Sequence, residues 1–182
     1  MLSQDECDRI LASFTLDTFE DVRDKAIIAT LAATGLRLEA VRTLPYSSYD
    51  RVTGEFTASE KGSVVRLGRL SPRAMKCLRE YLARRPRNTI TSQLWVSAPG
   101  KPLSNGGFNM VIRRARERSG IGRMHAHLFR HGMAQHAADS GADIGTIQTL
   151  LGHKSPAMAR RYAGEALNRQ GARLMVQFSP IG

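Results

Sequence analysis

Residues 125–131 read His-Ala-His-Leu-Phe-Arg-His, and the fold and the chemistry of this chain can be worked out from this stretch. On a helix, side chains three and four positions apart lie on one face. His127, Arg130 and His131 have that spacing, so their side chains can converge on one small object. The stretch therefore predicts a functional site on one face of a helix.

Two other interpretations of these histidines remain open. Histidines at positions i and i+4 can bind a metal ion such as zinc. However, the stretch contains no carboxylate to serve as a third ligand or base, and Arg130 between the histidines would repel a cation. We therefore predict no metal at this site. The histidines can also be structural residues that carry no chemistry.

Further chemistry-bearing residues lie on both sides of this stretch. In Leu151-Gly152-His153 the histidine follows Arg130 by 23 residues, and Tyr162 follows that histidine by nine. Thr34-Gly35-Leu36-Arg37 comes early in the chain, where Gly35 is expected to end a helix. Lys61 belongs to a Lys-Gly-Ser turn signal between two predicted strands, so we expect it at a hairpin tip.

In this order and at these separations, the motifs resemble the signature of the tyrosine recombinases and phage-type integrases. The resemblance covers nearly the whole chain, beginning with the predicted helix from Leu2 to Leu11. It implies the tyrosine recombinase (DNA breaking-rejoining) catalytic fold and an enzyme that cleaves and rejoins DNA strands. The catalytic residues that it implies are Arg37, Lys61, His127, Arg130, His153 and Tyr162.

Physical chemistry supports these roles. Attack by a phenol oxygen on a phosphodiester concentrates negative charge on the non-bridging oxygens, and fixed cations or donors must meet that charge. Arg37 and Arg130 suit a phosphate clamp because a guanidinium stays charged and its planar fork matches phosphate oxygens. His153 is expected to donate a further hydrogen bond to the phosphate. His127 can exchange a proton near neutral pH, so it is the expected base for the Tyr162 phenol.

By resemblance, Lys61 protonates the leaving 5′ oxygen, and Tyr162 becomes joined to DNA through a 3′-phosphotyrosyl bond. That bond conserves the phosphodiester energy, so strand exchange and religation need no ATP, metal or other cofactor. In the family, four protomers act on two duplexes. We therefore expect double-stranded DNA as the partner, a homotetramer on DNA, a monomer in free solution and no membrane association.

The chain departs from the family's pattern in two respects. Members commonly carry an acidic residue three positions after the first arginine, where this chain has Ala40. Glu39 is one position early, and a shift of one residue on a helix turns a side chain by about 100°. The N-terminal helical domain that usually clamps DNA is also not found here, so we interpret residues 1–182 as a single catalytic domain. The chain is either a fragment of a longer integrase or a minimal recombinase.

The charge of the chain favours a nucleic-acid partner. The formal net charge is +11, and basic groups that neutralise phosphates release condensed counterions. Residues 1–60 hold 6 Lys and Arg against 11 Asp and Glu, so the basic excess belongs to the later two thirds. No stretch reads as a membrane span or a secretory signal. We therefore expect a cytoplasmic location in a prokaryotic cell or a phage-infected host.

The hydrophobic pattern predicts an α+β fold that is mainly α-helical with a small three-stranded antiparallel sheet. The strands are expected over residues 49–52, 55–59 and 64–70, separated by turn signals. Capping residues, glycines and apolar periodicity predict the helices. These helices are expected at residues 3–14, 18–34, 38–44, from 71 onward, and at 104–120, 127–140, 144–151 and 156–163.

The predicted helix that begins at Ser104 is the candidate for DNA contact. Its N-terminus, at Ser104 and Asn105, offers free N–H groups and the positive end of the helix dipole to a phosphate. The family places this helix in the major groove of DNA. Ser104, Asn105 and Arg113 are therefore the expected DNA-binding residues.

Two further functions remain open. A type IB topoisomerase uses the same chemistry to relax one duplex, but such enzymes usually carry additional clamping regions. A catalytically inactive DNA-binding regulator with the same fold is the other alternative. Ala40 leaves room for the regulator. The presence of Arg37, Arg130, His153 and Tyr162 argues for the enzyme.

Overall fold

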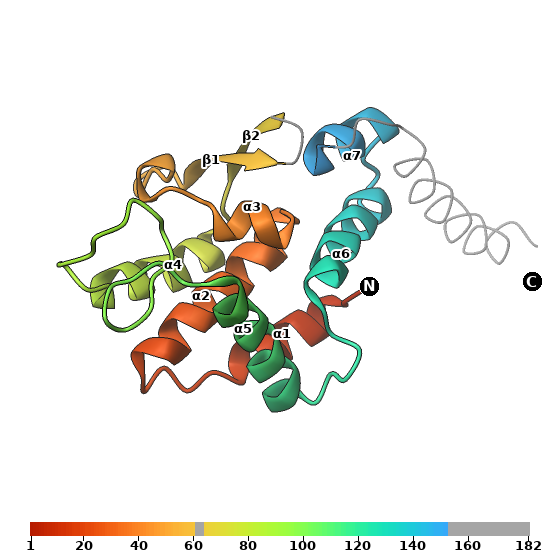
Figure 1. The fold of residues 1–182 in the computed structure, drawn as a ribbon. Helices are drawn as coiled ribbons and strands as arrows, with labels where there is room; N and C mark the ends of the chain where they lie inside the picture. The colour runs from red at the N-terminus through yellow and green to blue at the C-terminus, as the bar shows by residue number, and fades with distance from the viewer. Residues whose placement is uncertain (61–63, 153–182) are drawn as a thin grey trace, which may run out of the picture.

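The computed structural model describes residues 1–60 and 64–152, with helix α2 (Phe19–Thr34) at its centre (Figure 1). Thr18 caps the N-terminus of α2 by accepting a hydrogen bond from the Asp21 amide. Side chains all around this helix are buried, which is the pattern of a helix inside a core. Helices that pack against it include α1 (Gln4–Ala12), α4 (Pro72–Arg84), α5 (Asn105–Ser119) and α6 (Ala126–Asp139).

Most predicted helix boundaries agree with the structure to within one or two residues. The capping box between Ser3 and Glu6 begins α1, and Ser71 followed by Pro72 begins α4. Gly120 ends α5 in the left-handed conformation. Two short helices complete the described helical part, α3 (Leu38–Arg42) and α7 (Ile144–Leu151). The helix expected at residues 156–163 lies outside the described residues.

The sheet in the described part has two strands, so the prediction of a third strand at residues 49–52 was wrong. Strand β1 (Glu55–Glu60) pairs antiparallel with β2 (Val64–Arg69). Before β1 the chain forms the 3-10 helix η1 (Tyr46–Ser48), and Tyr49 makes only an isolated bridge to the first strand. The segment then turns because the Asp50 carboxylate accepts hydrogen bonds from two following backbone amides. The mainly helical α+β class is confirmed.

Gly35 connects the end of α2 to helices α6 and α7. Its φ of 57° is in the left-handed region that favours glycine. A Cβ atom at this position would lie 3.1 Å from the Met133 side chain and 3.6 Å from Leu151 Cδ2. Glycine is therefore required both by the backbone conformation and by the close approach of α6, and the Thr34–Arg37 segment lies against α6 and α7.

Ion pairs join the acidic first third of the chain to the basic remainder. Pairs that cross this boundary include Glu6–Arg123, Asp8–Arg73, Asp21–Arg118 and Asp24–Arg114. Much of the charge asymmetry along the sequence is therefore neutralised in space. Within the described ranges, no helix has the length and apolar character to cross a bilayer.

Candidate active site

The described residues include three of the six predicted catalytic residues. Arg37 lies at the N-terminus of α3, and both His127 and Arg130 lie on α6. The other three, Lys61, His153 and Tyr162, lie outside the described residues. The described part of the site is therefore built around two arginines that come from opposite halves of the chain.

Arg130 is a buried side chain that joins the C-terminal ends of α2 and α7. It is 3% exposed. Its Nη1 donates to the Gly35 carbonyl at 2.9 Å, and its Nη2 donates to the Leu151 carbonyl at the end of α7. The planar fork of a guanidinium suits two acceptors held at a fixed separation. The orientation of Arg130 is therefore set by backbone on both sides of it.

Arg37 approaches the same region from α3 and is more accessible. Its side chain is 40% exposed, and its Nη1 forms an ion pair with Glu60 Oε2. Arg130 Nη1 lies 3.5 Å from the other oxygen of that carboxylate, Glu60 Oε1. The structure thus brings Arg37 and Arg130 together at a single carboxylate, with Arg37 on the solvent side.

Glu60 is the site residue that the sequence analysis missed. Strand β1 alternates exposed and buried positions, and Phe56, Ala58 and Glu60 occupy the buried ones. The Glu60 side chain is 1% exposed and also accepts from Arg66 Nη1 at 2.9 Å. An acid at the inward position of a half-buried strand was the available signal, because a buried charge needs charged partners.

The acid that precedes Ala40 does not take part in this cluster. Glu39 pairs with Arg42 one turn along α3, and this hydrogen bonding lowers the pKa of the Glu39 carboxyl. Ala40 is buried at 3% exposed. Helix α3 therefore contributes a cation to the site through Arg37, and the acid comes from β1.

The end of α7 lies against the same cluster. Strands β1 and β2 lie beside α7 (Figure 1). Gly152 has a φ of 60°, and a Cβ atom there would lie 3.1 Å from Arg66 Cδ and 3.9 Å from Glu60 Oε2. The glycine of the Leu151-Gly152-His153 motif is thus favoured by its left-handed backbone conformation and by the close approach of Arg66.

His127 lies at the exposed edge of the cluster. Its ring meets the His131 ring edge to face, with 4.7 Å between the ring centroids. Partial burial lowers the pKa of His127 from its usual 6.5, and the positive charges of Arg130, His125 and Arg37 lower it further. The imidazole is therefore neutral at pH 7 and able to accept a proton.

We expect an NMR titration of His127 to give a pKa below 6.5, and Arg37→Met to raise it by removing a nearby cation. Below pH 6.5 the unfolded chain would bind a proton that the folded chain does not, so stability should fall as the pH drops from 6.5 toward the lowered pKa. A His127 pKa at or above 6.5, or one unaffected by Arg37→Met, would contradict this account of the site.

The geometry offers little support for a metal site. Within residues 1–60 and 64–152, no group of three His, Cys, Asp or Glu side chains is placed to hold a metal ion. His127 and His131 lie one turn apart with Arg130 between them in sequence, and the Arg130 charge bears on the His127 pKa. The absence of a metal from the mechanism stays a prediction.

Helix α5 presents the predicted DNA-binding residues at its surface. Ser104 caps the helix by accepting from the Gly107 amide at 3.1 Å, and Asn105 is exposed in the first turn. Arg113 is exposed and lies 3.5 Å from Glu117 one turn later. Arg114 instead pairs with buried Asp24 on α2, so part of the arginine run of α5 attaches this helix to the core.

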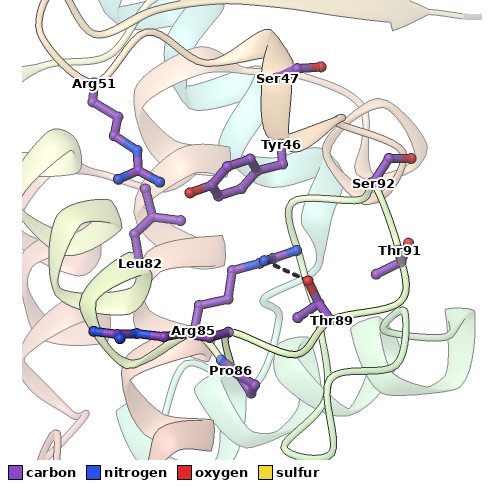
Figure 2. A pocket seen from close by; sticks show the side chains of 10 residues that line it. Tyr46, Ser47, Arg51, Leu82, Arg85, Pro86, Thr89, Thr91 and Ser92 are labelled. Atoms are coloured by element: carbon purple, nitrogen blue, oxygen red, sulfur yellow. Dashed lines mark hydrogen bonds between the residues drawn. The ribbon is translucent and has the colours of Figure 1, made fainter.

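A separate polar pocket of about 520 Å³ lies between η1, the end of α4 and the loop over residues 86–93 (Figure 2). The guanidinium groups of Arg51 and Arg85 lie 5.1 and 4.8 Å from the centroid of the Tyr46 ring. Arg85 also donates to Thr89 Oγ1 and to the Gln93 carbonyl, which ties the loop to α4. None of the predicted catalytic residues lines this pocket, so we do not assign the chemistry to it.

The sequence matches a known protein family over most of its length. A profile of the phage integrase family matches residues 1–169. The tyrosine recombinase XerC of Roseiflexus sp. (strain RS-1) is 32% identical over 152 residues, which cover 80% of this chain and 48% of XerC. The tyrosine recombinase XerD of Oceanobacillus iheyensis is 32% identical over 159 residues, which cover 84% of this chain and 53% of XerD. The chain thus spans about half the length of these relatives.

Solved structures agree with this assignment. The crystal structure of XerA recombinase superposes with a TM-score of 0.80 and 27% identity, covering 98% of this chain and 65% of XerA. The XerH site-specific recombinase, bound to a palindromic difH substrate in a post-cleavage complex, also has a TM-score of 0.80. Its 21% identity, over 97% of this chain and 52% of XerH, supports the fold alone. The chain therefore belongs to the phage integrase family and has the catalytic-domain fold of the tyrosine recombinases.

Proposed function

We propose that residues 1–182 form the catalytic domain of a site-specific DNA recombinase in which Tyr162 attacks a scissile phosphate. The observation that carries the proposal is the meeting of Arg37 and Arg130 at one buried carboxylate. Two guanidinium groups held at a fixed separation match the non-bridging oxygens of a phosphodiester. The product is a 3′-phosphotyrosyl bond, which a free 5′-hydroxyl reverses during strand exchange and religation.

The two arginines serve the phosphate in different ways. Arg130 is held by two backbone carbonyls, so its charge is in place before DNA binds and needs no reorganisation during the reaction. Arg37 is 40% exposed, so it can contact a phosphate at the surface while one N–H bonds to Glu60. Negative charge that develops on the phosphate is therefore met by one preorganised cation and one accessible cation.

The other tyrosines support Tyr162 as the nucleophile by elimination. The chain has four tyrosines. Tyr81 is fully buried, its hydroxyl bonded to backbone, and burial raises the pKa of both Tyr81 and Tyr49. Tyr46 lies in the separate pocket, where the guanidinium groups of Arg51 and Arg85 stack over its ring. Tyr162 is the remaining phenol, and its place nine residues after His153 matches the family motif.

The remaining roles complete the proton transfers. His127, neutral at pH 7, accepts the proton of the Tyr162 phenol. Lys61 gives a proton to the leaving 5′ oxygen, and His153 donates a hydrogen bond to the phosphate. Lys61 directly follows Glu60 in the chain, and His153 directly follows Gly152. Both neighbours belong to the cluster around Arg66, which supports this assignment.

The proposed substrate is double-stranded DNA, bound by a homotetramer that assembles from cytoplasmic monomers. Related structures include recombinase complexes with DNA, such as XerH with its difH substrate. Ser104, Asn105 and Arg113 on α5 are the proposed DNA contacts, since they lie at one end and on the exposed surface of that helix. DNA affinity should therefore weaken steeply as the salt concentration rises.

The test is to trap the covalent intermediate. The protein is incubated with a library of nicked suicide duplexes randomised around the nick, and the mixture is separated on a denaturing gel. A recombinase gives a band that survives denaturation and yields, after proteolysis, a DNA-linked peptide containing Tyr162. DNA binding without any such band would support the inactive regulator, and relaxation of supercoiled plasmid without junction formation would support a type IB topoisomerase.

A further inference from the structure

We propose that Glu60 is the positioning residue for both phosphate-binding arginines, in place of the acid that the family commonly carries where this chain has Ala40. This inference rests on the proposed function. It places on β1 the acid that the family resemblance would place on α3. The first consequence is that Glu60 controls the rate of DNA cleavage without touching DNA.

The contacts of Glu60 support this role. Its Oε2 accepts from Arg37, and its Oε1 accepts from Arg66 at 2.9 Å and lies 3.5 Å from Arg130 Nη1. One carboxylate thus compensates three guanidinium groups. Without its charge these cations would repel one another, and Arg37, the most exposed of them, would be the most free to move away.

Burial distinguishes positioning from direct catalysis. The Glu60 side chain is 1% exposed, and both of its oxygens face guanidinium groups. It therefore cannot reach a phosphate or accept a proton from one. Among the described residues, Glu60 is also the one carboxylate paired with Arg37, because Glu39 pairs with Arg42. The orientation of Arg37 depends on Glu60.

Arg66 completes the arrangement from the neighbouring strand. Its Nη2 donates to the Thr34 carbonyl at 3.1 Å, so the Glu60–Arg66 pair is attached to the end of α2. That end is the same segment whose Gly35 carbonyl holds Arg130. Glu60 is therefore held at a fixed position relative to the Gly35 carbonyl that binds Arg130. Its ion pair with Arg37 then holds the Arg37 guanidinium in a fixed position as well.

The test compares Glu60→Gln with Asp24→Asn. Asp24 is a matched control because its side chain is fully buried and also bridges two arginines, Arg23 and Arg114, away from the site. Both variants remove one buried charge at nearly constant volume. Both variants should therefore lose stability to a similar extent, which is measured as the fall in melting temperature.

The readout is the single-turnover rate of covalent complex formation on a suicide duplex selected by the wild type. The duplex is used with an ordinary scissile phosphate and with a methylphosphonate, which lacks one negative charge. We expect Glu60→Gln to slow the reaction about 100-fold on the phosphate but less than about tenfold on the methylphosphonate. The methylphosphonate develops less negative charge on its non-bridging oxygen, so its rate depends less on well-placed arginines. Asp24→Asn should change both rates equally, and Glu60→Gln should leave DNA affinity within about threefold.

Each outcome decides the proposal. Equal rate losses for Glu60→Gln on both duplexes, or a loss no larger than that of Asp24→Asn, overturn the positioning role and leave the proposed function intact. If Glu60→Gln does not fold, Glu60→Asp replaces it, because it keeps the charge on a shorter side chain and should show the same difference between the duplexes at smaller size. A wild type that forms no covalent complex overturns the proposed function and this inference with it.

Discussion

Tyr162→Phe is expected to abolish the covalent protein–DNA complex while leaving the affinity for duplex DNA unchanged. The substitution removes only the oxygen that would form the bond to phosphorus. Loss of a nucleophile lowers the rate by at least about 10⁴-fold in enzymes that use covalent catalysis. The measurement is the covalent band on a denaturing gel, read beside a binding isotherm on the same suicide duplex.

Tyr46→Phe is the matched control for this prediction. Tyr46 is 37% exposed and lies in the separate pocket with Arg51 and Arg85, so its hydroxyl has no part in the proposed reaction. The control should form the covalent complex at the rate of the wild type. Retention of the band in Tyr162→Phe, or its loss in Tyr46→Phe, would show that the nucleophile has been assigned to the wrong residue.

Arg130→Lys is expected to impair both cleavage and folding stability. Lysine keeps the positive charge but lacks the planar fork, so it cannot reach both the Gly35 and the Leu151 carbonyls. One buried acceptor is then left without a partner, which lowers the free energy of unfolding by about 2 kcal/mol. We expect the rate of covalent complex formation to fall about 1000-fold, since a preorganised donor to the phosphate is lost.

Arg37→Lys separates these two effects. The Arg37 side chain is 40% exposed, and lysine can keep its ion pair with Glu60, so the free energy of unfolding should change by less than about 1 kcal/mol. Cleavage should still slow about 100-fold, because lysine offers the phosphate a point charge in place of a fork. Urea denaturation and the covalent rate assay measure the two quantities. If Arg130→Lys cleaves DNA at a rate within about tenfold of the wild-type rate, Arg130 does not belong to the phosphate clamp.

The helix boundaries could be predicted from the sequence because the responsible interactions are local. Ser3 with Glu6, and Thr18, Ser71 and Ser104 alone, accept hydrogen bonds from free amides within three residues of themselves. Alternation alone was a weaker guide for the sheet. Residues 49–52 have an acceptable strand composition, but the Asp50 carboxylate competes successfully for two backbone amides and turns the chain.

The candidate site could be predicted only in part. Arg37, His127 and Arg130 were predicted from motif spacing, and the structure brings the two arginines together. Glu60 was not predicted, because it belongs to no motif and its strand was expected to end at Ser59. The arginine run of α5 was a similar case. The basic excess of the later two thirds of the chain indicated a nucleic-acid partner, yet Arg114 and Arg118 of this run pair with acids on α2.

By itself, the sequence determined where the helices begin and end, since caps depend on neighbours in the chain, and motif spacing predicted which residues carry the chemistry. Only the tertiary structure decided which charges meet. Arg130 is held by carbonyls 95 and 21 residues away, and Glu60 by a guanidinium 23 residues before it. A buried carboxylate is stable only where folding surrounds it with cations, and that depends on how α2, α6, α7 and the two strands pack together.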